Sequence, residues 1–201
     1  MAGGRPRTFD AEAALDRAVE VFWRQGYEGT AVSELTERMG VNKPSLYAVF
    51  GTKEELFQQV VRRYAEVELA YFRDALTRPT AMEVVRDYLD RNAVALTRPD
   101  RPRGCLSIQG GLSANPAHDT VTQFLASSRR AGEDALAERL TRAREEGDLP
   151  ADADPAALAR YVMVVSEGQA VHASAGATRD ELMQSAAIAL KAFEQALAPA
   201  G

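Results

Sequence analysis

The stretch from Thr30 to Phe50, TAVSELTERMGVNKPSLYAVF, constrains the fold more than any other part of the chain. In its first half the apolar residues Val32, Leu35 and Met39 follow the i, i+3 and i+7 spacing of one helical stripe. Gly40 then stands where a helix is expected to end. The first half therefore predicts a short helix that is closed by a glycine-containing turn.

The second half of this stretch predicts another short helix with a polar outer face. Asn42 can cap the helix, and Pro44 falls in the first turn, where a missing amide hydrogen costs little. Leu46 and Phe50 are four residues apart and can bury one side. Two short helices joined by such a turn predict a helix-turn-helix whose second helix fits the major groove of DNA.

Three segments extend this pattern into a longer match: FWRQGYEGT at 22–30, MGVNKPSLY at 39–47 and FGTKEEL at 50–56. Through them the chain resembles the DNA-binding domain of the TetR family of bacterial transcriptional regulators. The resemblance covers about residues 8–64 without a gap. It implies an all-α protein with an N-terminal arm and helix-turn-helix domain over residues 1–53. Residues 54–201 are then expected to form a helical ligand-binding and dimerisation domain.

The predicted recognition helix and its flanks supply the candidate DNA contacts. Lys43 and Tyr47 suit phosphates, and Lys53, at the start of the next helix, suits a phosphate clamp. Ser45 and the amide of Asn42 can reach base edges or phosphate oxygens. The alternative is that Asn42 only caps the helix and that Tyr47 only packs beside its neighbour.

Three further residues complete the expected DNA surface. Thr30 is expected to cap the second helix, and the resemblance implies that it also touches a phosphate. Arg38 is expected to flank the same surface. Pro44 is small and has no group that can hydrogen-bond a base, so we expect modest or shape-based sequence specificity.

The rest of the chain predicts further helices, about nine in all, and no strand. Capping boxes mark three helix starts, at Thr52–Glu55, Thr80–Glu83 and Thr178–Glu181. The first of them opens a long helix whose expected inward residues run from Leu56 through Val67 to Tyr71. The resemblance implies that this helix links the DNA-binding head to the body.

Polar residues interrupt the apolar stripes of the predicted body helices. A buried polar group needs a hydrogen-bond partner, so several of them near aromatic side chains predict a mostly apolar effector pocket. The alternative is that backbone or water satisfies each one. The candidate pocket residues are Tyr71, Tyr88, Asn92, Cys105, Gln109, Phe124, Ser128 and Met163.

The last two predicted helices are apolar on more than one side, which suggests a partner helix pair. The resemblance implies a homodimer that is built through a four-helix bundle of these helices. The alternative is that they only complete the core of one protomer. The candidate interface residues are Val165, Gln169, His172, Leu182, Ala186, Leu190 and Phe193.

Catalytic and metal-binding patterns are missing from the sequence. We find no Ser-His-Asp arrangement, phosphate-binding loop or HExxH motif, so we expect no catalytic residue, metal or cofactor. The single cysteine, Cys105, has no histidine at metal-binding spacing. The segment GCLSIQ at 104–109 resembles the start of the sixth helix in one TetR subgroup. Cys105 is therefore interpreted as a pocket-wall residue, with a redox, electrophile or metal sensor as the alternative.

Composition and charge narrow the function further. The first 53 residues hold seven basic and seven acidic residues, so the net charge of −5 lies wholly in the remainder. DNA affinity is then expected to depend on a few placed cations. No segment approaches the ~18 continuous apolar residues of a membrane span, and the N-terminus lacks the apolar core of a signal peptide. We expect a cytoplasmic protein without membrane association, and one cysteine fits a reducing compartment.

These observations favour a homodimeric repressor that a small, largely apolar effector releases from double-stranded operator DNA. One alternative is a constitutive DNA-binding regulator without an effector. Another is an enzyme with an accessory helical head, which the missing catalytic pattern disfavours.

Overall fold

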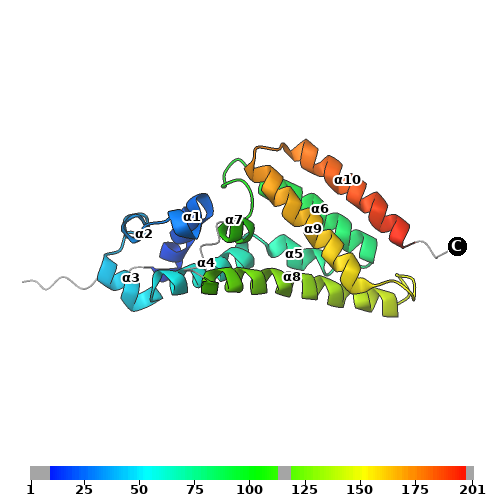
Figure 1. Cartoon of the computed structure of the whole chain (residues 1–201), viewed down its shortest axis with the longest axis horizontal. Helices are drawn as coiled ribbons and strands as arrows, with labels where there is room; N and C mark the ends of the chain where they lie inside the picture. Colours follow the sequence, from blue (N-terminus) through cyan, green and yellow to red (C-terminus); the bar gives the residue numbers. More distant parts are fainter. Residues whose placement is uncertain (1–9, 113–118, 198–201) are drawn as a thin grey trace, which may run out of the picture.

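The computed structural model describes residues 10–112 and 119–197, and in these ranges the only regular secondary structure is α-helix (Figure 1). This confirms the expected class, with ten helices in those ranges where about nine were expected. The predicted N-terminal arm lies outside the described residues. The helices are α1 Ala11–Gly29, α2 Val32–Met39, α3 Lys43–Phe50, α4 Lys53–Val67, α5 Ala70–Ala75, α6 Ala81–Leu96, α7 Leu106–Leu112, α8 Asp119–Glu145, α9 Pro155–Ser174 and α10 Arg179–Ala196.

The additional helix arises because the predicted long helix ends early. The helix α4 stops at Val67, and Leu69 leaves helical geometry with φ −102° and ψ 15°. Arg73 of α5 donates to the carbonyls of Ala65 and Glu66 at 2.8 and 2.6 Å, and so satisfies acceptors at the end of α4. Val67 is 50% exposed, so the expectation that it faces inward is wrong. No glycine or proline marks this break in the sequence.

All three predicted capping boxes are present. In each, the threonine hydroxyl accepts a hydrogen bond from the glutamate amide three residues later, and the glutamate carboxylate accepts one from the threonine amide. Each pair satisfies two amides that a helix start otherwise leaves without partners. They cap the N-termini of α4, α6 and α10, with Thr52, Thr80 and Thr178 as the N-cap residues.

Two hydrophobic clusters hold the molecule together. One joins α1–α4 to the end of α6, α7, the start of α8, the end of α9 and the start of α10. It includes the edge-to-face pair of Phe22 and Phe57, whose ring centroids are 5.0 Å apart. The other joins α5, α6, α8, α9 and α10. Because the buried side of α4 packs on α1, the boundary predicted after residue 53 falls inside a continuous core and stays a prediction.

The head and body meet at Trp23 of α1. Its indole Nε1 donates a hydrogen bond to the carbonyl oxygen of Gly104 at 3.1 Å. Its ring packs edge-on against the ring of Tyr64 in α4, with 4.8 Å between the ring centroids. Figure 1 shows α7 between the helix-turn-helix and the α9/α10 end of the molecule. Gly104 lies two residues before the start of α7, so the head is bonded to the segment that leads into this helix.

A buried arginine ties α8 to the turn between α5 and α6. Arg139 is 5% exposed and donates to the carbonyl oxygens of Leu76, Arg78 and Pro79 at 3.2, 2.7 and 2.8 Å. Within the described ranges no carboxylate pairs with it, so these three carbonyls are what compensates its desolvation.

Replacing Arg139 by leucine should lower the free energy of unfolding by about 2–4 kcal/mol, because three carbonyls lose a charged donor. Urea denaturation measures this change. The matched control is Arg142→Leu on the same helix, where the guanidinium is exposed and lies 3.9 Å from Glu146. A control variant that loses as much stability as Arg139→Leu would contradict the structural role of Arg139.

Candidate DNA-binding head and effector pocket

The helix-turn-helix predicted from the sequence is present. Gly40 adopts φ +71° at the end of α2, a conformation that suits glycine, and it turns the chain toward α3. The Asn42 side-chain oxygen accepts a hydrogen bond from the Ser45 amide at 2.8 Å and caps α3. Leu46 and Phe50 are buried in the head cluster, so the opposite side of α3 faces outward.

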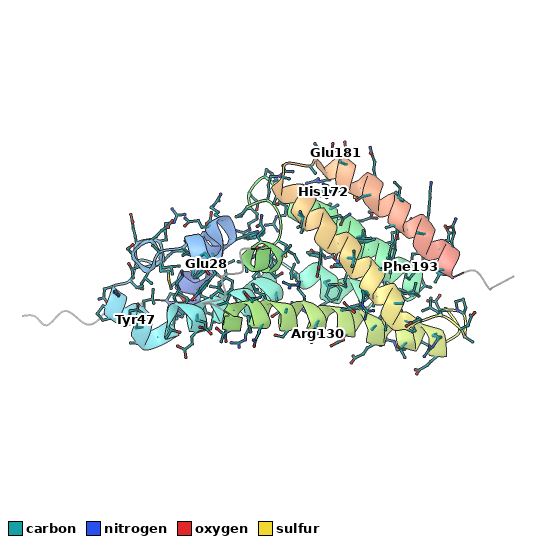
Figure 2. The ribbon with its side chains drawn as sticks, in the orientation of Figure 1. Glu28, Tyr47, Arg130, His172, Glu181 and Phe193 are labelled. Atoms are coloured by element: carbon teal, nitrogen blue, oxygen red, sulfur yellow. The ribbon has the colours of Figure 1, made fainter. Side chains whose placement is uncertain are left out.

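The outward face of α3 carries a basic and an aromatic group side by side. The Lys43 ammonium lies 5.9 Å from the centroid of the Tyr47 ring, and both side chains are exposed. Figure 2 shows Tyr47 at one end of the molecule, at the far end from Phe193. An exposed cation beside a phenol at a projecting helix is suited to a phosphate-bearing duplex.

Lys53, at the start of α4, borders the same end of the molecule. Its ammonium lies 4.3 Å from the centroid of the Tyr27 ring. Burial lowers the pKa of Lys53, and the nearby Glu28 carboxylate opposes that shift. The ring contact holds the ammonium at the N-terminus of α4, beside the recognition helix.

The remaining predicted head residues divide into exposed and buried groups. Arg38, Asn42 and Pro44 are exposed, and Ser45 is half-buried. Thr30 is 2% exposed and does not cap α2, whose first position follows Ala31 without a side-chain cap. Its hydroxyl donates to the Gly26 carbonyl at 2.7 Å and closes α1 instead, so the expected capping role is wrong. A side chain this buried is also badly placed for a phosphate.

The body holds a cavity of about 120 Å³ between α4, α5, α6, α8, α9 and the segment at the start of α7. Aromatic and aliphatic side chains form most of its wall, including Val61, Leu69, Phe72 and Ile108. Six of the predicted pocket residues line it: Tyr71, Tyr88, Asn92, Cys105, Ser128 and Met163.

Two predicted pocket residues lie elsewhere. Gln109 turns toward Gly104 and donates to the Arg103 carbonyl at 3.4 Å, and its Oε1 is buried without a hydrogen-bond partner in the described ranges. Phe124 packs against the head cluster beneath the Arg62 guanidinium, 5.4 Å from its ring centroid. Cys105 precedes α7, so the four-residue spacing to Gln109 does not place both on one helix face.

The polar groups of the cavity wall are largely satisfied by one another. The Tyr71 hydroxyl donates to Asn92 Oδ1 at 2.8 Å, and Asn92 Nδ2 donates to Gln169 Oε1 at 2.7 Å and to the Ser166 carbonyl at 3.2 Å. The Tyr88 hydroxyl donates to Ser166 Oγ at 2.9 Å. Burial raises the pKa of both tyrosines, so both keep their protons. Asn92 therefore braces the pocket and has little capacity left to anchor an effector.

Two charged residues of the cavity wall were not predicted from the sequence. Arg129 of α8 donates to the Ser107 carbonyl at 3.2 Å. The carboxylate of Glu167 in α9 forms no hydrogen bond or ion pair with other residues of the described ranges. Burial raises the pKa of Glu167, and the nearby Arg129 opposes that shift. The sequence signal that could have identified Glu167 is its position between two small residues, Ser166 and Gly168.

The outer side of α9 and α10 forms an open apolar groove. Its most exposed apolar residues are Tyr161, Val164 and Ile188, which are 38%, 63% and 70% exposed. Val165 and His172 line the groove, as do Gln169 and Leu182 at its base.

Three predicted interface residues point into the protomer instead. Ala186, Leu190 and Phe193 belong to the body cluster and are 0%, 9% and 1% exposed. The apolar stripe of α10 therefore covers its own core, and a different set of residues, including Ile188, faces outward. The sequence pattern could not separate these two apolar sides.

Within residues 10–112 and 119–197, no three His, Cys, Asp or Glu side chains gather as a metal site. No helix in the same ranges is long and apolar enough to cross a membrane.

Comparisons with known proteins agree with this geometry. Residues 14–60 match the family model of bacterial regulatory proteins of the tetR family, and residues 81–196 match the tetracyclin repressor-like C-terminal domain. The HTH-type transcriptional repressor ComR of Escherichia coli is 32% identical over 96% of this chain and 92% of its own. YezE of Bacillus subtilis, an uncharacterised HTH-type regulator, is 35% identical over 79% and 83%.

A solved structure resembles the whole chain closely. It is a cysteine mutant of the TetR family regulator CifR in complex with 26-bp double-strand operator DNA. Its TM-score is 0.89 at 38% identity, over 94% of this chain and 99% of that one. The helix-turn-helix, the two family models and these relatives establish that the chain is a DNA-binding transcriptional regulator of the TetR family.

Proposed function

We propose that this regulator is a homodimeric repressor that a small, largely apolar effector releases from operator DNA. The observation that supports it most directly is the bond between pocket wall and head. Cys105 and Ser107 line the cavity, and Gly104, next in the chain, accepts the hydrogen bond of Trp23. An occupant of the cavity acts on the segment to which the head is bonded.

The release mechanism follows from the symmetry of a dimer. Two recognition helices must lie about 34–36 Å apart, or the equivalent for overlapping sites, to enter successive major grooves. An effector that prefers the protomer shape with another spacing lowers operator affinity by its differential affinity for the two shapes. Repression rather than activation is favoured by the relative ComR, which is described as a transcriptional repressor.

The position of Cys105 allows a test of the alternative that this cysteine is a redox, electrophile or metal sensor. Cys105 is 8% exposed, lines the cavity and has its sulfur 3.0 Å from the Ser107 hydroxyl oxygen. If Cys105 senses by covalent modification, Cys105→Ser should abolish the response to an electrophile such as N-ethylmaleimide. If the effector binds reversibly, Cys105→Ser should keep its response.

The DNA assignment is tested with a duplex that the purified protein selects from a random pool, here called the selected duplex. Lys43→Ala combined with Tyr47→Ala should weaken its binding and reduce the salt slope by about one, because a phosphate contact is lost. A gel-shift titration at several salt concentrations measures both. Lys191→Ala, which removes an exposed lysine of α10, is the control. Unchanged affinity in the double variant would remove Lys43 and Tyr47 from the interface.

The dimer assignment is tested on the outer side of α10. Ile188→Asp should split the dimer, because an interface would bury an unpaired charge at a cost of several kcal/mol. Sedimentation velocity measures the oligomeric state. Ala187→Asp adds the same charge at an exposed position that does not line the groove, and it should leave the dimer intact. If the Ile188→Asp variant still sediments as a dimer, the interface must lie elsewhere on the protein.

The pocket assignment is tested by filling the cavity. A cavity on the order of 150 Å³ holds benzene, so phenol is a probe of suitable size. Phenol should raise the melting temperature of the parent protein and not that of Ser128→Phe, because a bound ligand stabilises the folded state. The control is Ser127→Phe: both serine hydroxyls donate to the Phe124 carbonyl, but Ser127 is exposed and lies outside the cavity wall. An equal response in Ser128→Phe would refute the pocket and leave DNA binding standing.

A further inference from the structure

The centre of the outer face of α3 is small and apolar. An α-helix turns by about 100° per residue, so the two residues that lie opposite the buried Leu46 and Phe50 are Pro44 and Ala48. Both are exposed. When this helix enters a major groove, these two side chains face the base edges most directly.

Larger and more polar groups stand at the flanks of this face. On one flank Lys43 and Tyr47 lie together, with the ammonium 5.9 Å from the ring centroid. On the other flank are Ser45, which is half-buried, and Val49, which is 48% exposed. Charge and phenol thus stand at the edge of the groove, where the phosphates run, and not over the bases.

The chemistry of the central pair selects one kind of base edge. Neither side chain of Pro44 or Ala48 can donate or accept a hydrogen bond. In the major groove, thymine alone among the four DNA bases presents a methyl group, which apolar side chains contact. The nearest amide, on Asn42, has its oxygen occupied by the Ser45 amide.

We propose that Pro44 and Ala48 are specificity-determining residues that recognise thymine 5-methyl groups in each operator half-site. This rests on the family's DNA-binding function and names the base edge that the recognition helix selects. The expectation of modest or shape-based specificity considered only hydrogen bonds at Pro44. A proline ring four residues from a methyl group forms a continuous apolar surface, which complements a methyl group without any polar contact.

The test removes single methyl groups from the DNA. Each thymine of the selected duplex is replaced in turn by uracil, which keeps the base pair and its hydrogen-bonding groups and lacks only the methyl. At one or two positions per half-site, the affinity of the parent protein should fall by about fourfold, the factor expected for one buried methyl. Replacing cytosine by 5-methylcytosine elsewhere in the duplex controls for nonspecific effects of methyl groups.

Protein variants assign the effect to residues. Pro44→Ala and Ala48→Ser keep helix-compatible side chains and should reduce the uracil penalty at the affected positions. Val49→Ala, on the flank, should keep the full penalty. Melting temperatures of all three variants check that the head remains folded.

The outcomes separate this proposal from the function on which it rests. A uracil penalty that persists unchanged in both Pro44→Ala and Ala48→Ser overturns it, and so does a parent protein that tolerates every uracil. In those cases, selection of a duplex that depends on Lys43 and Tyr47 still supports DNA binding. If no duplex is enriched from the pool, both the proposal and the DNA-binding assignment fail.

Discussion

The hydrogen bond from the Trp23 indole to the Gly104 carbonyl is the contact on which the working arrangement depends. It is buried, it spans 81 residues of sequence, and it joins the first helix of the head to the segment that forms one wall of the cavity. Trp23 also packs on Tyr64, which lines the cavity from α4. Head and pocket therefore share two contacts at a single side chain. Both walls therefore contact α1 directly, with no intermediate residue between them and the head.

The body, in contrast, is braced across its interior. The hydrogen bonds among Tyr71, Asn92 and Gln169 connect α5, α6 and α9, and Gln169 donates onward to the Leu182 carbonyl of α10 at 3.0 Å. Because a buried polar group without a partner costs more than a made hydrogen bond gains, this network favours one relative position of four helices. The outer groove of α9 and α10 is thereby held in a defined shape from behind.

Many of the helix ends could be predicted from the sequence, because they depend on residues that act locally. The glycine at 40, the asparagine cap at 42 and the Thr–Glu boxes determine helix ends through contacts within a few residues, and all lie where the sequence placed them. The break before α5 could not be predicted, because it depends on Arg73 reaching back to carbonyls of the preceding helix. The orientation of α10 could not be predicted from the sequence for a similar reason. Phe193 and Ile188 are both apolar, and only the packing of neighbouring helices determines which of them is covered.

The pocket shows the same difference between local features, which the sequence predicts, and tertiary contacts, which it does not. Asn92 was correctly placed at the cavity, since a polar residue on an apolar stripe is visible in sequence. Its saturation by three protein partners depends on tertiary neighbours and was not visible.

The distribution of charge along the molecule has a consequence for how this protein finds its site. The recognition helix projects from one end, and the chain beyond residue 53 holds the whole negative excess (Figure 1). Phosphates repel the body, so random sequence holds the protein only through the few cations of the head. Weak attachment of this kind shortens each sliding run along DNA. We therefore expect the search for an operator to proceed mainly by dissociation and renewed encounter through solution.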